Sequence, residues 1–424
     1  MKLRDYQVAA LEFCKKRKGN ILLSIATGKG KSVLSLELIK DHLENQKGNI
    51  LVLCPTQIIR QQLHNLYKSK VETKIIDCKN GLAKSRVGTA RVFICCYPTY
   101  QSLTKNELSF LLTISLLIID EVHKVNTKTI LGKLIMKISQ LTTLRKIGLT
   151  ATPGSKRNLK EIKEVLSCSS EDVYSDHNPL YEKKERVIEL TTSLWRLSLI
   201  ESITEDLINN FCLRYNLPLK FSQFHFNTRE ISKRGYLLTS YYMILNKFNR
   251  LIHGATPFRI SSYYQKNIKA CKLPVCNCLS SKTIKLLSNL ELETDQRFNF
   301  LYKESLNKRI IFVDDILVGQ ELRSVIPNCY FISSKDKREV RGIIRKLSKE
   351  KTFTLVATSI AEEGLNLNLD EVLNFEVPTT KIKLEQRRGR VGRYNPGVVT
   401  YFNLPGTYGS SLINRYSIKN HSSN

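Results

Sequence analysis

A short glycine-rich segment, residues 25–32 (Ile-Ala-Thr-Gly-Lys-Gly-Lys-Ser), has the residue types that can hold the phosphates of a nucleotide. Gly28 and Gly30 let the backbone curl so that its N–H groups face phosphate oxygens. Lys31 would reach the β- and γ-phosphates, and Ser32 would ligate Mg²⁺. The strict pattern has glycine at the first position of this segment, so the segment is a variant of the phosphate loop. The predicted nucleotide contacts of the loop are Thr27, Gly28, Lys29, Gly30, Lys31 and Ser32.

An acidic pair, Asp120 and Glu121, follows the apolar residues 115–119. Asp120 would hold Mg²⁺, and Glu121 would orient and deprotonate the water that attacks ATP. Acidic pairs are common at the ends of strands, but they rarely coincide with an upstream phosphate loop. The two motifs together predict a site that hydrolyses Mg²⁺–ATP.

Arginines alternate with glycines in residues 386–393, Gln-Arg-Arg-Gly-Arg-Val-Gly-Arg. Arginine side chains are permanently charged and bind phosphate groups through two parallel N–H donors. A basic helix of this kind could be a plain nucleic-acid patch. Its place at the end of a second α/β region favours arginine fingers that reach the ATP, and Arg390 and Arg393 are predicted for that role.

Tyr6 and Gln7 precede the phosphate loop and could clamp the adenine ring. Tyr6 would stack on the ring, and the Gln7 amide would offer its edge both a donor and an acceptor. In the alternative interpretation, Tyr6 is an ordinary core residue.

Both halves of the chain alternate short apolar runs with helical patterns, which indicates an α/β protein with parallel sheets. Strands are predicted in the first half at residues 20–23, 49–53, 91–96, 115–119 and 145–149, with one more strand of the first domain at 186–191. Strands are predicted in the second half at residues 308–313, 329–332, 353–357, 371–375 and 398–402. The motifs stand at the carboxyl ends of these strands, where an open α/β sheet binds ligands.

The middle of the chain, residues 193–280, has apolar residues at helical spacing and is predicted to be a mainly helical insert. Aromatic and basic residues alternate in residues 236–252; they could bind a nucleic-acid strand or form a core face with a solvated basic back. A zinc site could be suggested by His253, Cys271, Cys276 and Cys278. Their spacing matches no usual zinc pattern, so unpaired thiols are favoured.

Composition favours a globular protein with a polyanionic partner. The 424 residues carry a formal net charge of +29, which indicates nucleic acid, although a lysine-rich proteome would have the same effect. A hydrophobic content of 42% excludes a disordered chain. The 11 cysteines are irregularly spaced, which favours reduced thiols in the cytoplasm or nucleus. We expect no signal peptide after Met1 and no membrane span, because the apolar run at residues 110–119 is too short.

The motifs stand in an order that resembles the superfamily 2 helicases of the DExH type: Tyr6-Gln7, residues 26–32, Pro55-Thr56, Asp120-Glu121-Val122-His123 (DEVH), residues 150–152, residues 356–365 and residues 386–393. The branch that contains Hef, XPB and the RIG-I-like enzymes is the most similar. The resemblance implies two tandem RecA-like domains, at residues 1–192 and 281–424, around the helical insert at 193–280.

The resemblance also implies roles for individual residues. Arg390 and Arg393 would contact the γ-phosphate, Gln386 the attacking water and Gly364 the nucleotide. His123 would relay the nucleotide state to the Thr-Ala-Thr segment at residues 150–152. The nucleic-acid track would include Pro55, Thr56, Arg60, Thr99 and Thr358. Asn366 stands where many relatives have an acid that binds the ribose, so that contact is not expected.

These observations predict an ATP-dependent helicase or translocase with ATP and Mg²⁺ as cofactors. The resemblance implies movement in the 3′→5′ direction and favours DNA over RNA. The alternatives are an ATPase that remodels complexes without unwinding, an RNA helicase, and a non-catalytic nucleic-acid-binding protein. Intact Lys31, Asp120, Glu121, Arg390 and Arg393 argue against the last alternative.

Overall fold

The computed structural model describes residues 3–76, 90–178, 180–206, 236–269, 279–290, 295–302, 307–333, 337–362, 365 and 367–418. The chain divides into two compact units. The first contains Met1–Glu182 with two short segments from later in the chain, Glu362–Asn366 and Glu385–Asn395. The second contains Lys183–Ala361, Leu367–Leu384 and Pro396–Asn424.

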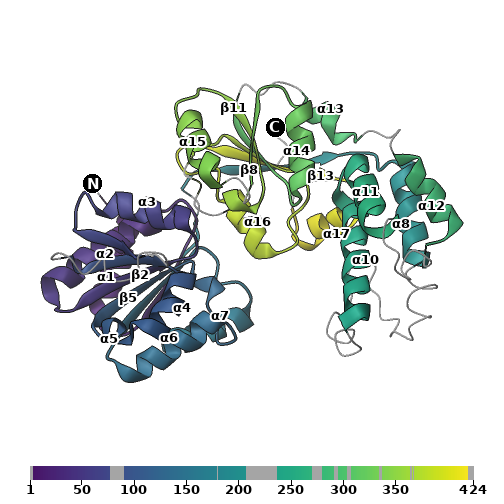
Figure 1. The fold of residues 1–424 in the computed structure, drawn as a ribbon. Helices are drawn as coiled ribbons and strands as arrows, with labels where there is room; N and C mark the ends of the chain where they lie inside the picture. The colour runs from purple at the N-terminus through teal and green to yellow at the C-terminus, as the bar shows by residue number, and fades with distance from the viewer. Residues whose placement is uncertain are drawn as a thin grey trace. The chain divides into compact units, whose positions relative to one another are not determined.

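The first unit is built on a seven-stranded sheet with the order β3-β4-β2-β5-β6-β1-β7, in which all strand pairs are parallel (Figure 1). The strands are β1 (Ile21–Ile25), β2 (Asn49–Cys54), β3 (Thr73–Ile76), β4 (Val92–Cys96), β5 (Ile114–Asp120), β6 (Arg145–Thr150) and β7 (Val173–Asp176). The sequence did not predict β3 and β7, which are the short strands at the two edges.

Helices cover both faces of this sheet. Successive residues of β1 point to opposite faces, so Leu23 packs in one core and Leu22 in another. The first core includes residues of α1 (Asp5–Lys16), α2 (Lys31–Asn45) and α3 (Gln57–Tyr67). The second includes residues of α4 (Tyr97–Asn106), α5 (Leu108–Leu111), α6 (Ile130–Leu141) and α7 (Lys156–Leu166). The continuous apolar strands of the sequence follow from this burial on two sides.

The second unit contains a six-stranded parallel sheet with the order β10-β11-β9-β12-β13-β8. The strands are β8 (Lys183–Glu189), β9 (Lys308–Phe312), β10 (Cys329–Ile332), β11 (Phe353–Ala357), β12 (Glu371–Asn374) and β13 (Gly397–Asn403). The α/β prediction with two parallel sheets is therefore confirmed.

One strand lies in a different sheet from the one predicted. The sequence places a strand at residues 186–191 in the first domain, but β8 pairs with β13, from Lys183 opposite Gly397 to Glu189 opposite Asn403. The alternating half-exposed pattern of β8 indicates an edge strand. Such a pattern does not specify which sheet supplies the partner strand, so the sequence could not decide between them. The domain boundaries at residues 192 and 280 remain predictions.

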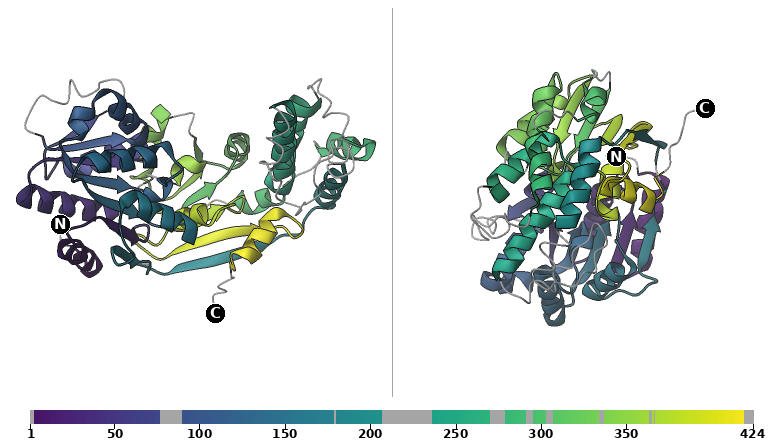
Figure 2. Two further views of the ribbon diagram at one scale, coloured as in Figure 1. Left: turned by 90° about the horizontal axis from the view of Figure 1, so that it is seen from below. Right: turned by 90° about the vertical axis from the view of Figure 1, so that its right-hand side faces the viewer.

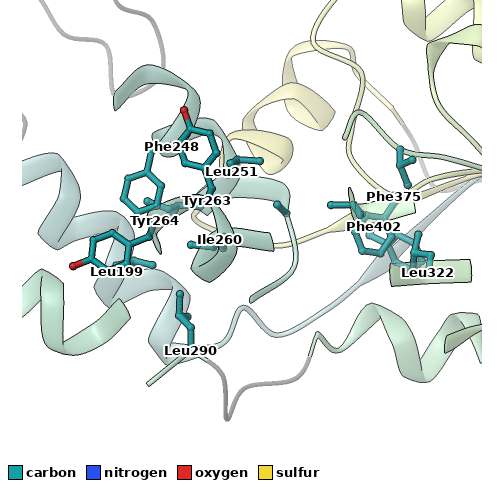
Figure 3. Packing of buried hydrophobic residues seen from close by; sticks show 14 of the residues in the cluster. Leu199, Phe248, Leu251, Ile260, Tyr263, Tyr264, Leu290, Leu322, Phe375 and Phe402 are labelled. Atoms are coloured by element: carbon teal, nitrogen blue, oxygen red, sulfur yellow. The ribbon is translucent and has the colours of Figure 1, made fainter. Parts of the chain in front are cut away.

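The helices of the middle region pack on the second sheet. They include α8 (Leu194–Asp206), α10 (Tyr236–Gly254), α11 (Pro257–Tyr264), the π-helical turn η3 (Gln265–Lys269) and α12 (Ser281–Ser288). Figure 2 shows these helices grouped together. One hydrophobic core joins Leu199 and Phe248 of these helices to Phe375 and Phe402 of the sheet region (Figure 3). The insert is therefore mainly helical where it is described, and it shares its core with the second sheet.

The remaining helices complete the second unit and the connection to the first. They are α13 (Arg297–Leu301), α14 (Ile316–Val325), α15 (Lys337–Leu347), η6 (Ser359–Ala361), α16 (Lys381–Arg388) and α17 (Tyr408–Arg415). None of the described helices combines the length and the apolar character that crossing a bilayer requires.

Candidate functional site

The glycine-rich loop connects the end of β1 to the start of α2 in a shape that suits an anion. Gly28 and Gly30 have φ angles of 83° and 74°, in the left-handed region that glycine adopts without strain. Gly30 precedes α2, and no side chain caps the N–H groups of the first turn. Uncapped N–H groups and the helix dipole together favour a negatively charged ligand at this point.

Lys31 lies half-buried in this loop, and its Nζ donates a hydrogen bond to the carbonyl of Ile25 at 3.2 Å. Burial lowers the pKa of the ammonium, while the carboxylates of Glu121 and Asp120 act in the opposite direction. The loop lysine and the acidic pair are therefore close enough to interact, as a site for a phosphate-bound metal ion requires.

The acidic pair is held at the end of β5 by an aromatic side chain that the sequence did not single out. The Tyr97 hydroxyl donates to the carbonyl of Asp120 and lies 3.2 Å from the carbonyl of Glu121. The N–H of Glu121 donates to Oδ1 of Asp120 at 3.1 Å. Glu121 has a φ of 53°, a left-handed conformation that is unusual for glutamate. Backbone strain of this kind is concentrated at functional sites.

Glu121 and His123 form a buried pair beside the Thr150 segment. Nδ1 of His123 lies 3.3 Å from Oε2 of Glu121 and 3.0 Å from Oγ1 of Thr150. Burial alone would raise the pKa of the Glu121 carboxyl, but His123, Lys31 and Arg390 outweigh it and lower the pKa to about 2. Apart from the contact with His123, the buried Oε2 of Glu121 has no hydrogen-bond partner among the described residues. It is therefore an ionised acceptor that a bound water would satisfy.

The arginine-rich segment belongs to the first unit by its contacts. A Cβ on Gly28 would lie 2.8 Å from Cγ of Arg393, and a Cβ on Gly389 would lie 1.6 Å from Oγ1 of Thr27. The glycines therefore let the loop and the segment approach closely. Arg393 also donates to the carbonyls of Gly389 at 2.8 Å and Leu365 at 3.2 Å.

Arg390 and Arg387 anchor the same segment. Arg390 is 7% exposed and donates to the carbonyls of Leu365, at 2.8 Å, and Glu362. Arg387 is fully buried and pairs with the Glu362 carboxylate at 2.8 Å. Gln386, predicted to contact the attacking water, is 5% exposed. Arg387 was not among the predicted site residues, because a charged side chain in a basic run looks solvated when its buried partner is distant in sequence.

Tyr6 and Gln7 contact the loop rather than standing apart from it. The Tyr6 hydroxyl and Nε2 of Gln7 both donate to the carbonyl of Lys29, at 3.1 and 3.2 Å. The Lys29 ammonium pairs with Asp176 at 2.5 Å and lies 4.5 Å from the centre of the Tyr6 ring. The charge of the Lys29 side chain is therefore neutralised within the protein, and the predicted nucleotide contact of Lys29 remains a prediction.

The predicted nucleic-acid contacts fall in both units. Pro55 and Thr56 follow β2, Thr99 follows the neighbouring strand β4, and Thr358 follows β11 in the second unit. Thr56 caps α3 by accepting from the N–H of Ile59 at 3.3 Å, and Thr99 is 4% exposed. Arg60 donates to the carbonyl of Ile76 at 3.3 Å. Their proposed contacts with nucleic acid remain predictions.

Some predicted positions fall outside the described residues. These positions are Gly364, Asn366, Cys271, Cys276 and Cys278. His253 is described: it is buried, and its Nδ1 accepts from the N–H of Tyr408 at 3.2 Å.

Comparison with known proteins finds two family models that match separate parts of the chain. Residues 1–155 match the family "Type III restriction enzyme, res subunit", and residues 284–395 match "Helicase conserved C-terminal domain". The Pyrococcus furiosus Hef helicase domain superposes with a TM-score of 0.64 at 19% identity, covering 97% of this chain and 98% of that one. Both matched regions agree with the superfamily 2 helicase resemblance that the motifs carry. Both matched regions contain site residues, Lys31 and Asp120 in the first and Arg390 in the second.

Curated superfamily 2 relatives are similar over most of this chain. The ATP-dependent DNA helicase Fml1 of Schizosaccharomyces pombe is 24% identical over 93% of the chain and 56% of its own length. YqhH, an ATP-dependent helicase of Bacillus subtilis, is 23% identical over 91% of the chain and 71% of its own length. Saccharomyces cerevisiae Dbp5, solved with RNA and ADP BeF3, has a TM-score of 0.59 at 14% identity, covering 98% of this chain and 87% of that one. The chain spans little more than half the length of Fml1.

Proposed function

We propose that this protein is an ATP-driven helicase or translocase that acts on nucleic acid, with DNA favoured. The observation that supports this best is the charge arrangement around the phosphate loop. Lys31 and Arg390 are close enough to Glu121 to lower the pKa of its carboxyl, and Arg393 packs against the loop glycine Gly28. A triphosphate is the ligand whose charge complements such a cluster.

The side chains present fit ATP and Mg²⁺. Lys31 and the uncapped N–H groups of α2 would hold the phosphates, and Ser32 and Asp120 would hold the metal. When bound, Mg²⁺ would neutralise the phosphate oxygens and so lower the cost of charge that develops during transfer. The buried, unsatisfied Oε2 of Glu121 would accept a hydrogen bond from the attacking water.

Glu121 would then act as the base for that water. Burial raises the pKa of its carboxyl, but His123, Lys31 and Arg390 together lower the pKa to about 2. Once these cations pair with phosphates, their effect on Glu121 weakens, so its pKa rises toward the range in which a base is useful. His123 and Thr150, 3.0 Å apart, would link this change to residues 150–152.

DNA is favoured because Fml1 is described as a DNA helicase. The net charge of +29 suits a nucleic acid of either kind. Movement in the 3′→5′ direction rests on the family resemblance alone. An RNA helicase is the second candidate, since the structural neighbour Dbp5 was solved with RNA. Remodelling without unwinding is the third.

One experiment separates these candidates. ATP hydrolysis by the full chain is measured with matched single-stranded, duplex and forked DNA and RNA, and strand displacement is measured on the best activator. We expect the largest stimulation with single-stranded or forked DNA. Stimulation by RNA alone would support the RNA helicase, and stimulation without displacement would support remodelling. No stimulation by any strand would contradict the proposal.

The loop lysine supplies the matched variant for this assay. Lys31→Ala should abolish stimulated hydrolysis, because it removes the cation nearest the predicted phosphates. Lys40→Ala removes the same charge from the same helix, where Lys40 pairs with Glu37 at 2.7 Å, and should leave turnover within about twofold, as expected for a surface pair. Full turnover in Lys31→Ala would contradict the assigned loop.

A further inference from the structure

The second unit contains a cavity of about 750 Å³ that the ATP site does not use. It lies between the helices α10 and α11 and the carboxyl ends of β9, β12 and β13. Figure 3 shows Leu251 and Tyr263 on the helices and Phe375 and Phe402 on the sheet side; all four line the cavity. Its volume is in the range of small-molecule binding pockets.

The floor of the cavity is aromatic and rigid. Phe375 is 1% exposed, and the Arg297 guanidinium lies 3.6 Å from the centre of its ring. Arg297 is fixed in turn by Asp295, at 2.6 Å, and by the carbonyl of Phe375, at 2.8 Å. A floor that is held in this way loses little conformational entropy when a flat apolar ligand binds.

The rim carries three cations, of which Lys247 also lies 5.5 Å from the centre of the Tyr263 ring. Lys247 and Arg250 are exposed and three residues apart on α10, so they are neighbours on one helix face. Lys383, in α16, also lines the cavity. None of the three has an ion-pair partner among the described residues. Such a rim favours a ligand with negatively charged groups beside its apolar part.

Three carboxylates also line the cavity: Asp315, which pairs with Arg259 at 2.8 Å, and the neighbouring Asp314 and Glu376. Glu376 accepts the N–H of Asp314 at 3.1 Å, which holds the pair at the ends of β9 and β12. Carboxylate oxygens accept hydrogen bonds from the amino groups of cytosine and other bases. An aromatic floor, a cationic rim and carboxylate acceptors together match a nucleotide: a flat base, an anionic phosphate and an amine-bearing edge.

We propose that this cavity receives the base of one unpaired nucleotide of the bound strand, with the adjoining phosphates on Lys247, Arg250 and Lys383. The inference rests on the proposed function, because it requires the protein to bind a nucleic-acid strand. It adds a base-specific contact on the second unit to binding that is otherwise dominated by the backbone.

The test is equilibrium binding of the full chain to a short single strand in which one abasic position is moved along the sequence. In the wild type, we expect one abasic position to weaken binding about tenfold, as loss of one stacked base does elsewhere. The variant Met243→Ala/Lys247→Ala removes two exposed residues at the rim, so folding should be unaffected. This variant should bind the intact strand more weakly, and the abasic position that weakens binding to the wild type should no longer weaken binding to the variant.

The control is Lys285→Ala, which removes one exposed charge from α12 outside the cavity and should lose affinity at that abasic position as the wild type does. The cavity proposal would be overturned if every abasic position weakened binding equally. It would also be overturned if the rim variant lost as much affinity at the sensitive abasic position as the wild type does. If the strand still binds and stimulates hydrolysis, the proposed function stands; if no strand binds, both fail. A free mononucleotide or an acidic peptide that competes as well as the strand would assign the cavity to another ligand and overturn the proposal.

Discussion

Lys29, a predicted nucleotide contact, shows how the surroundings of a motif residue depend on segments distant in sequence. Its ammonium is 2.5 Å from Asp176, and its carbonyl accepts from Tyr6 and Gln7. The motif itself, and the loop shape it requires, could be predicted from spacing. Asp176 could not, because it ends a four-residue edge strand, 147 positions away, that the sequence does not indicate.

Replacing Asp176 should affect nucleotide binding more than turnover. Asp176→Asn leaves the buried Lys29 ammonium without its counter-charge. We expect the Lys29 carbonyl to shift as a result, together with the Tyr6 and Gln7 side chains that donate to it. We expect the KM for ATP to rise roughly three- to tenfold, about 1 kcal/mol of binding, with kcat nearly unchanged. Steady-state kinetics measure both. The control is Asp172→Asn, which removes an acid that lies 3.6 Å from Arg17. An equal rise in the KM for ATP in both variants would contradict the role assigned to Asp176.

Lys146 predicts a pH dependence of stability that is independent of the active site. It is 1% exposed, and its Nζ donates to the carbonyl of Val165 and to Ser167, both at 3.1 Å. Burial lowers its pKa to about 8, below the ordinary value of 10.5. Between these values the unfolded chain binds more protons than the folded chain, so the free energy of unfolding rises with pH.

The variant Lys146→Met should remove this slope. The difference in unfolding free energy between wild type and variant should change by on the order of 2 kcal/mol between pH 8 and 10.5. Denaturant unfolding at several pH values measures it. Parallel stability profiles for the two proteins would contradict the buried-ammonium account.

At the scale of elements, the order of strands and helices was largely predictable, but sheet membership was not. Buried strands such as β1 and β5 are continuous apolar runs that end in motif residues, so they are visible in the sequence. The half-exposed β8 lacks such a signal, and its partner β13 lies more than 200 residues later. Partners distant in sequence are decided by tertiary packing, which a local pattern does not record.

Replacing two helix glycines of the second unit with alanine should change the free energy of unfolding in opposite directions. A Cβ on Gly319 of α14 would lie 2.2 Å from Cε2 of Phe331, so Gly319→Ala should lower the unfolding free energy by about 1–2 kcal/mol. A Cβ on Gly342 of α15 meets nothing within 4 Å, so Gly342→Ala should raise it by roughly 0.5–1 kcal/mol. Denaturant unfolding compares them, and equal shifts in both variants would contradict this packing.

At the scale of the whole molecule, the central claim is that charged residues from the two ends of the chain form one ATP site. Lys31 lies near the start, and Arg390 and Arg393 near the end, yet all three belong to the same compact unit. The net charge of +29 suits a polyanionic partner, and hydrolysis at this site would be coupled to binding that partner.

The most direct test is ATP turnover of the wild type and of Arg393→Ala, each with and without single-stranded DNA, alongside ATP affinity. Arg393 packs on the loop glycine Gly28, where a Cβ would lie 2.8 Å from its Cγ. The account predicts DNA-stimulated turnover in the wild type, and a loss of about 10³-fold in Arg393→Ala with ATP binding largely retained. An unstimulated wild type, or an Arg393→Ala variant that keeps its turnover, would contradict it.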